Sequence, residues 1–261
     1  DNLGSELEDP FGALLPLIKT IIHKRNEFDF DYIDDLEQIY NAISEFGISF
    51  SSKHRYIIGQ FIDFCLDHYA RIHQNQELGK KSLEILEILA GSDENYITIL
   101  KEKGICPLIM ESIQKTYPAV FYTEIKILTH FVQFPPAQLL FDQGFDLQFI
   151  MNHMVFNHYE TVHEIFKFLS FYIQLPNLTG DSLNYILEFF KELKKDPRYT
   201  SLLNEFNGDL YNWGQILCNL AQRDFHEFAG LFCEGILIDF YNENIYNKYF
   251  MKDLSRFYCF L

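Results

Sequence analysis

The chain has 261 residues, and 48% of them are hydrophobic, which is too apolar for an intrinsically disordered protein and suits one or two domains or one elongated repeat domain. Its formal net charge is −16, and half of that charge lies in the first fifty residues, which argues against binding to nucleic-acid phosphates or anionic lipid. The charge instead favours either simple solubility or a basic protein partner.

The first part of the chain predicts a polar segment followed by amphipathic helices. Residues 1–10 are polar and acidic, and we expect them to form a loose lead-in. Apolar residues then recur at steps of three and four over 11–24, 32–46 and 53–72, which is the spacing of one helix face. The polar run 73–81 is expected to link the last of these helices to the next element.

The central stretch predicts three successive helices. Its first helix is amphipathic, starts near Lys80 and is expected to break at Gly91 and Ser92. A second helix follows and ends at Gly104, because glycine just past the last periodic residue is a common helix stop. The third helix, over 105–113, is largely apolar.

The second half continues the helical pattern. Helices are expected over 118–134, 160–174 and 210–222, with two more within 236–261. The range 199–208 fits either a short helix or an insert. No segment shows sustained strand alternation, so the expected fold class is all-α.

The cysteines indicate a reducing compartment. They are scattered singly, their number is odd, and none forms a CxxC pair, which is typical of buried reduced thiols. We therefore expect an intracellular protein that is located in the cytoplasm, with the nucleus as the alternative. No run of 18 apolar residues occurs, so no membrane span is expected. The cysteines are Cys65, Cys106, Cys218, Cys233 and Cys259.

The long helices repeat at a nearly constant interval. Aligned by their last apolar steps, their first polar positions are 43, 42, 41 and 48 residues apart, and the longest interval contains 199–208. A fixed period of this length is typical of stacked helical repeats, whose units bury their apolar faces against one another. The aligned positions are Asn41, Glu84, Lys126, Lys167 and Gln215.

Between the long helices lie shorter ones that end in glycine and are followed by an apolar residue. The glycines are Gly104, Gly144 and Gly235, and the long helices end in ILA at 88–90 and NLA at 219–221. In these features the chain resembles the armadillo repeat family, and HEAT-type repeats share much of the pattern.

The resemblance covers roughly residues 32–249. It implies a right-handed α-α superhelix of about five repeats, in a single domain over 11–261, with the third helix of each unit lining a concave groove. The family acts almost wholly through protein contacts. The resemblance therefore implies a non-enzymatic scaffold or adaptor that binds a protein or peptide segment along the groove. The third unit departs from the pattern, because the segment 176–180, which stands where its first helix would be, is too short to form one.

The polar side chains of the groove-lining helices are the candidate binding residues. Within each helix they are three or four residues apart and so share a face. Phe171 would supply an aromatic anchor, and the competing interpretation is an ordinary solvated face. The candidates are Glu84, Glu87, Lys126, His130, Gln133, Glu164, Lys167, Phe171, Gln215 and Asn219.

Motifs for catalysis or metal binding are missing from the sequence. No P-loop, GxGxxG, GxSxG, HExxH or CxxC motif occurs. His153, His158 and His163 recur every five residues, a step that does not keep side chains on one helix face. We therefore expect no enzymatic activity, no metal and no cofactor.

Other functions remain as alternatives. One is a regulatory armadillo domain of the GTPase-effector or formin type, and another is a divergent nuclear-import adaptor. Import adaptors carry a ladder of Trp and Asn on the groove-lining helices, with each Trp four residues before its Asn. In this chain Asn219 matches the Asn position, but Gln215 occupies the corresponding Trp position. The other repeats have Ile88, His130 and Phe171 at the Asn position. A hydrolase of unrecognised type is the third alternative and would require a deep polar pocket.

Overall fold

The computed structural model describes residues 10–24, 32–46, 52–115, 118–134 and 159–175, together with 147, 150, 178, 182 and 186. Throughout these residues the backbone forms helices joined by short turns, and this part of the chain contains no strand. The all-α prediction is confirmed to that extent. The helices expected over 210–222 and within 236–261, and the range 199–208, lie outside the described residues.

The expected helices over 11–24, 32–46, 118–134 and 160–174 are present, and their ends agree with the sequence pattern to within two residues. The elements are α1 (Pro10–His23), α2 (Tyr32–Phe46), the 3-10 helix η1 (Ser52–His54), α3 (Arg55–Ala70), α4 (Gln76–Ser92), α5 (Glu94–Glu102), α6 (Ile105–Gln114), α7 (Pro118–Gln133) and α9 (Tyr159–Tyr172).

The start of α4 differs from the prediction. The range 73–81 was expected to be a linker, but α4 already begins at Gln76. Asn75 caps the helix, because its side chain accepts a hydrogen bond from the backbone N–H of Leu78 at 3.1 Å. The first turns of α4 are polar because they face solvent, so their composition resembles that of a loop.

The end of α4 also differs. The break expected at Gly91 and Ser92 is wrong, because α4 continues through both residues. The helix stops at Asp93, whose side chain accepts from the backbone N–H of Asn95 at 2.8 Å and caps α5. The Gly104 boundary is confirmed: this residue has φ +78°, a left-handed conformation that favours glycine, and α6 starts immediately after it.

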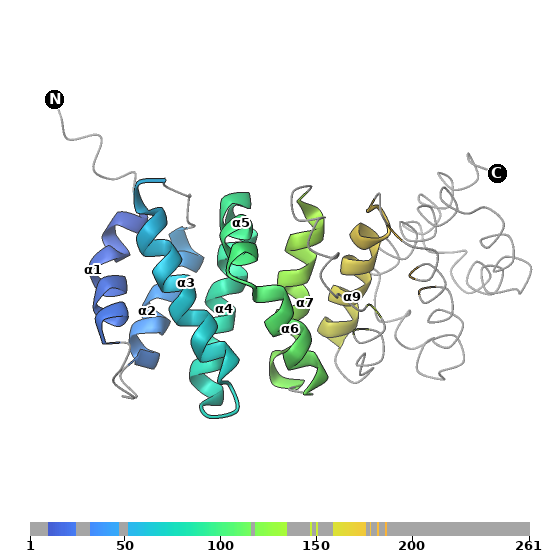
Figure 1. Cartoon of the computed structure of the whole chain (residues 1–261), viewed down its shortest axis with the longest axis horizontal. Coiled ribbons are helices and arrows are strands. Elements are labelled where there is room, and N and C mark those ends of the chain that lie inside the picture. The colour runs from blue at the N-terminus through green and yellow to red at the C-terminus, as the bar shows by residue number, and fades with distance from the viewer. Residues whose placement is uncertain are drawn as a thin grey trace, which may run out of the picture. The chain divides into compact units, whose positions relative to one another are not determined.

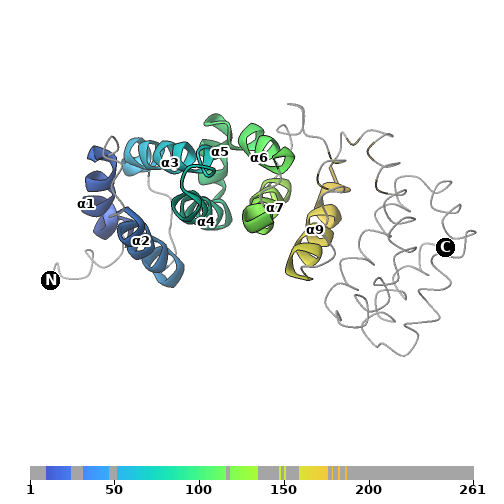
Figure 2. The ribbon, with the colours of Figure 1, turned by 90° about the horizontal axis from the view of Figure 1, so that it is seen from below.

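The chain divides into two compact units, Asp1–Phe145 and Asp146–Leu261, of which the first contains α1 to α7 and the second α9. In the first unit α4 packs against α2, α3 and α7. Figures 1 and 2 show α2, α4 and α7 side by side in one layer, with α3, α5 and α6 in the other. The sequentially aligned long helices are therefore neighbours in space within this unit.

Large rings fill the space between the two layers. Phe61, Phe64 and Tyr69 of α3 and Tyr96 of α5 are fully buried. Burying each such side chain contributes roughly 1.5–3 kcal/mol. Cys106 is also buried, and the loss of water around it raises the pKa of its thiol to about 12.

Replacing glycine by alanine should have opposite effects on stability at two helical positions, Gly79 and Gly59. A Cβ added at Gly79 in α4 would lie 2.7 Å from Ile72 Cγ1 and 2.9 Å from Ile72 Cα, whereas one at Gly59 in α3 would meet only Lys103 Cε at 3.9 Å. Gly79→Ala should therefore lower the free energy of unfolding by about 1–3 kcal/mol through overpacking. Gly59→Ala should raise it by roughly 0.5–1 kcal/mol, because alanine is the better helix former.

Urea unfolding of the two variants, followed by circular dichroism, measures both effects. If Gly79→Ala stabilised the protein as Gly59→Ala does, the close approach of the α3–α4 turn to α4 would be contradicted.

Candidate functional site

The candidate residues of α4 and α7 lie together on the layer formed by α2, α4 and α7. Glu87 of α4 contacts Lys126 and His130 of α7, and Glu84 pairs within α4 with Lys81, which was not among the candidates. All five side chains are half-buried. We call this set the polar cluster. It consists of Lys81, Glu84, Glu87, Lys126 and His130.

Glu87 is the centre of the polar cluster. Its Oε1 lies 2.9 Å from Lys126 Nζ and 3.3 Å from His130 Nε2, and its side chain is 15% exposed. Burial alone would raise the pKa of this carboxyl. The hydrogen bonds from His130 and Lys126, together with their charges, outweigh burial and hold the pKa below its usual 4.5. Glu87 therefore joins α4 to two successive turns of α7.

Glu84 and Lys81 extend the polar cluster toward α2. Lys81 Nζ lies 3.1 Å from Glu84 Oε2 and 4.6 Å from the centroid of the Tyr40 ring in α2. The second contact has the geometry of a cation–π interaction. Polar contacts thus connect α2 to α4 and α4 to α7, the same helices that the sequence period aligns.

Gly91 makes room for the histidine of the polar cluster. A Cβ at this position would lie 3.0 Å from both Cε1 and Nε2 of His130. Because glycine has no side chain, the imidazole can rest against the last turn of α4. Gln133, the remaining candidate on α7, is half-buried.

The α2 part of this layer is acidic. The helix contains four acidic and no basic side chains. Glu37, Asn41 and Glu45 are all exposed and follow one another at steps of four, so they share one face of α2. Asn41 is the position that the sequence period aligns with Glu84 and Lys126, so this face belongs to the same layer as the polar cluster.

The second unit contains three further candidates on α9. Glu164 is buried, which differs from the solvent-facing position that its stripe predicts. Its neighbours Ile165 and Phe168 are also buried, so Glu164 lies on the packed side of the helix, where Lys167 Nζ approaches it at 3.4 Å. Lys167 and Phe171 are half-buried. The candidates Gln215 and Asn219 lie outside the described residues.

Sequence reasoning missed a second polar group, which is buried. Glu124 of α7 is 1% exposed and accepts a hydrogen bond from Tyr69 of α3. The sequence does contain a signal for it: Glu124 falls between Phe121 and Leu128, on the apolar stripe of its helix. A carboxylate on such a stripe predicts either a buried hydrogen-bonded acid or a functional site.

The described residues hold neither a metal-binding cluster nor a membrane-spanning helix. They contain no group of three or more His, Cys, Asp or Glu side chains placed to hold a metal ion. None of the helices in this part of the chain has the length and apolarity needed to cross a membrane. Of the three regularly spaced histidines, His153 and His158 lie outside the described residues, and His163 lies in α9.

Comparison of the chain with models of protein families, with curated proteins and with solved structures found no match.

Proposed function

We propose that this chain is an α-solenoid of the armadillo type and acts as a non-enzymatic scaffold, binding a segment of a partner protein along the layer formed by α2, α4 and α7. The observation that carries the proposal is the packing of α4 against both α2 and α7. These three helices are the ones that recur at intervals of 43 and 42 residues. Contact between successive equivalents is the arrangement that a stacked repeat requires.

A row of equivalent helices offers an extended surface rather than a deep pocket. Such a surface suits an extended peptide, whose successive side chains can meet successive helices. Aromatic side chains such as Tyr40 would supply contact area, since buried aromatic groups carry much of the energy at protein interfaces. Charged groups would set the position of the peptide and the rate of association.

The charge distribution favours a basic segment. In the polar cluster the carboxylates of Glu84 and Glu87 are already neutralised by lysines. On α2 the exposed Glu37 and Glu45 have no basic residue within their own helix. The negative potential of the layer is therefore concentrated on α2, and Lys or Arg residues of the partner would bind there.

A selection from a displayed library of random peptides tests the proposal. We expect the chain to enrich peptides rich in Lys and Arg. Fluorescence anisotropy should show that the enriched peptides bind about tenfold more weakly to the double variant Glu37→Lys/Glu45→Lys, because each reversal turns an attraction into a repulsion. Both residues are exposed, so the fold should tolerate the change.

The double variant Glu94→Lys/Glu102→Lys is the matched control. It makes the same change of charge at the same spacing of eight residues, but on α5 in the opposite layer. Its affinity should stay close to that of the wild type. If both variants lost the same affinity for the peptides, the effect would be due to net charge alone. If the α2 variant lost no affinity, this layer would be excluded as the docking surface.

A further inference from the structure

A buried carboxyl group lies where three helices of the first unit meet. Glu124 of α7 is 1% exposed, and its Oε1 accepts a hydrogen bond from Tyr69 Oη of α3 at 2.5 Å. Ser112 of α6 is 8% exposed and adjoins both groups. The junction therefore connects α7 to α3 and α6, on a different side of α7 from the contacts that Lys126 and His130 make with α4.

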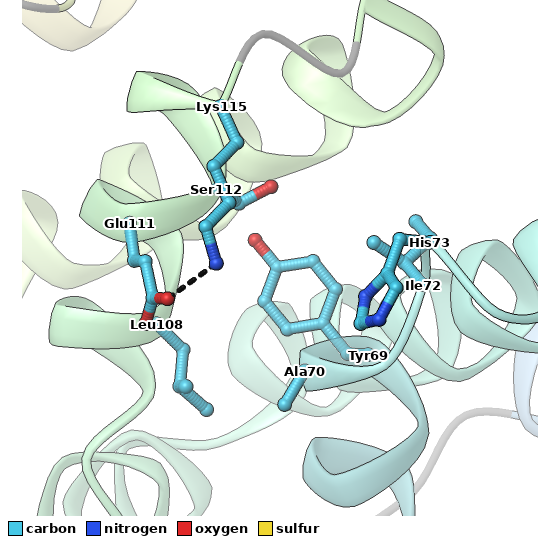
Figure 3. A pocket seen from close by; sticks show the side chains of 8 residues that line it. All are labelled: Tyr69, Ala70, Ile72, His73, Leu108, Glu111, Ser112 and Lys115. Atoms are coloured by element: carbon cyan, nitrogen blue, oxygen red, sulfur yellow. Dashed lines mark hydrogen bonds and ion pairs between the residues drawn. The ribbon is translucent and has the colours of Figure 1, made fainter.

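A small cavity leads to this junction. Tyr69 and Ser112 form part of its wall, and the Tyr69 ring reaches from α3 toward α6 with its hydroxyl directed at Ser112 (Figure 3). The cavity has a volume of about 40 Å³, which exceeds the space that one water molecule needs. Ser112 Oγ is buried and makes no hydrogen bond. Water that enters the cavity would therefore find an unpaired polar atom beside Tyr69.

In the part of the chain that the structure describes, no cation compensates a charge on Glu124. Around the cavity, α6 presents Glu111 and Lys115, which pair with each other, and the turn after α3 presents His73. On the other side of α7, Lys126 and His130 are paired with Glu87 of α4. Within the described residues no basic side chain lies within ion-pair distance of Glu124. An ionised Glu124 would therefore be a buried charge stabilised only by hydroxyl groups, which is costly.

We propose that the junction of Glu124, Tyr69 and Ser112 is a proton-dependent switch, which keeps α7 seated on α3 and α6 while Glu124 is protonated and lets α7 open when the carboxyl ionises in contact with water. Burial raises the pKa of Glu124 to about 7, and the neighbouring hydroxyl groups of Ser112 and Tyr69 lower it only in part. In the opened form the carboxyl is solvated and returns to its usual pKa of 4.5.

The sign of the response follows from these two pKa values. The seated form holds the proton more tightly, so rising pH favours the opened form between pH 4.5 and about 7. Above about pH 7 both forms are ionised, and the ratio no longer changes. Because α7 also carries Lys126 and His130, opening would displace the polar cluster. The switch itself does not depend on whether that layer binds a partner.

Infrared spectroscopy and hydrogen exchange on the full chain test the proposal. We expect the carbonyl band of a protonated carboxylic acid that disappears with a midpoint at about pH 7 and is missing in Glu124→Gln. The protection factors of amides in α6 and α7 should fall by about tenfold per pH unit from pH 4.5 to about 7 and then level off. In Glu124→Gln they should not respond in this range.

Two further variants separate the switch from a general effect. Glu111→Gln, at the mouth of the cavity, should keep both the band and the pH response. In Tyr69→Phe the loss of one hydrogen bond to the carboxyl should move the midpoint of the band upward, and this test remains valid if Glu124→Gln does not fold. The proposal is overturned if no band titrates near pH 7, if Glu124→Gln retains that band, or if the band titrates while the protection of α7 stays constant.

Discussion

Replacing Phe64 by alanine is expected to lower the free energy of unfolding by about 3–5 kcal/mol, the usual cost of removing a buried phenyl ring from a packed core. Phe64 lies in α3 and is fully buried. Its ring centroid lies 5.7 Å from that of Tyr32 in an edge-to-face arrangement and 4.4 Å from that of His68. The ring therefore fills the space between α3 and the start of α2, and a methyl group would leave a cavity there.

Urea unfolding followed by circular dichroism measures this loss, and Tyr56→Ala is the matched control. Tyr56 lies on the same helix but is 77% exposed, so removing its ring should change the free energy of unfolding by no more than about 0.5 kcal/mol. If the two variants lost similar amounts, the aromatic core between α2 and α3 would not be the main source of stability in this part of the protein.

Helix positions could be predicted wherever burial follows the helical period. In α2, Leu36, Ile39 and Ile43 are fully or almost fully buried, and the helix spans the predicted residues 32–46. The first turns of α4 give no such pattern, because Leu78 is their only large apolar side chain. The start of α4 is set instead by the cap at Asn75, which acts through one hydrogen bond and leaves no trace in the composition of the segment.

The candidate site was predictable as a set of helix faces but not as a set of contacts. The period places Lys126 in register with Glu84, yet Lys126 pairs with Glu87, almost one turn further along α4. That choice depends on the relative tilt and shift of α4 and α7, which tertiary packing determines. Glu124 was missed for a related reason, because its partner Tyr69 is 55 residues away on a helix from the other layer.

The stability of the protein is expected to decrease as the pH rises from 4.5 to about 7, because Glu124 has a higher pKa in the folded state than in the unfolded chain. Its pKa rises from 4.5 to about 7 on folding, chiefly through burial. The folded state therefore binds the extra proton in this range, and raising the pH costs about 3 kcal/mol of stability in total. Above about pH 7 the contribution of Glu124 no longer changes.

Glu124→Gln should remove this dependence, because the amide cannot ionise and its oxygen can still accept the hydrogen bond from Tyr69. Its free energy of unfolding should exceed that of the wild type by about 3 kcal/mol at pH 8, and the difference should vanish near pH 4.5. Urea unfolding at a series of pH values measures both curves. A wild-type curve that rises between pH 4.5 and 7, or a Glu124→Gln curve that falls as steeply as the wild type, would contradict the assignment.

Glu87 has the opposite effect on the pH dependence of stability, at acidic pH. Its pKa is lowered in the folded state, because the hydrogen bonds and charges of His130 and Lys126 outweigh the effect of burial. The stability that it contributes is present above pH 4.5 and is lost as the pH falls through its folded-state value. The contribution of Glu87 thus rises up to about pH 4.5 and that of Glu124 falls above it, so their combined contribution to stability is largest near that pH. Glu87→Gln should flatten only the acid side of the curve and Glu124→Gln only the neutral side, because Glu87 pairs with Lys126 and His130 whereas Glu124 bonds to Tyr69, and the two groups share no partner.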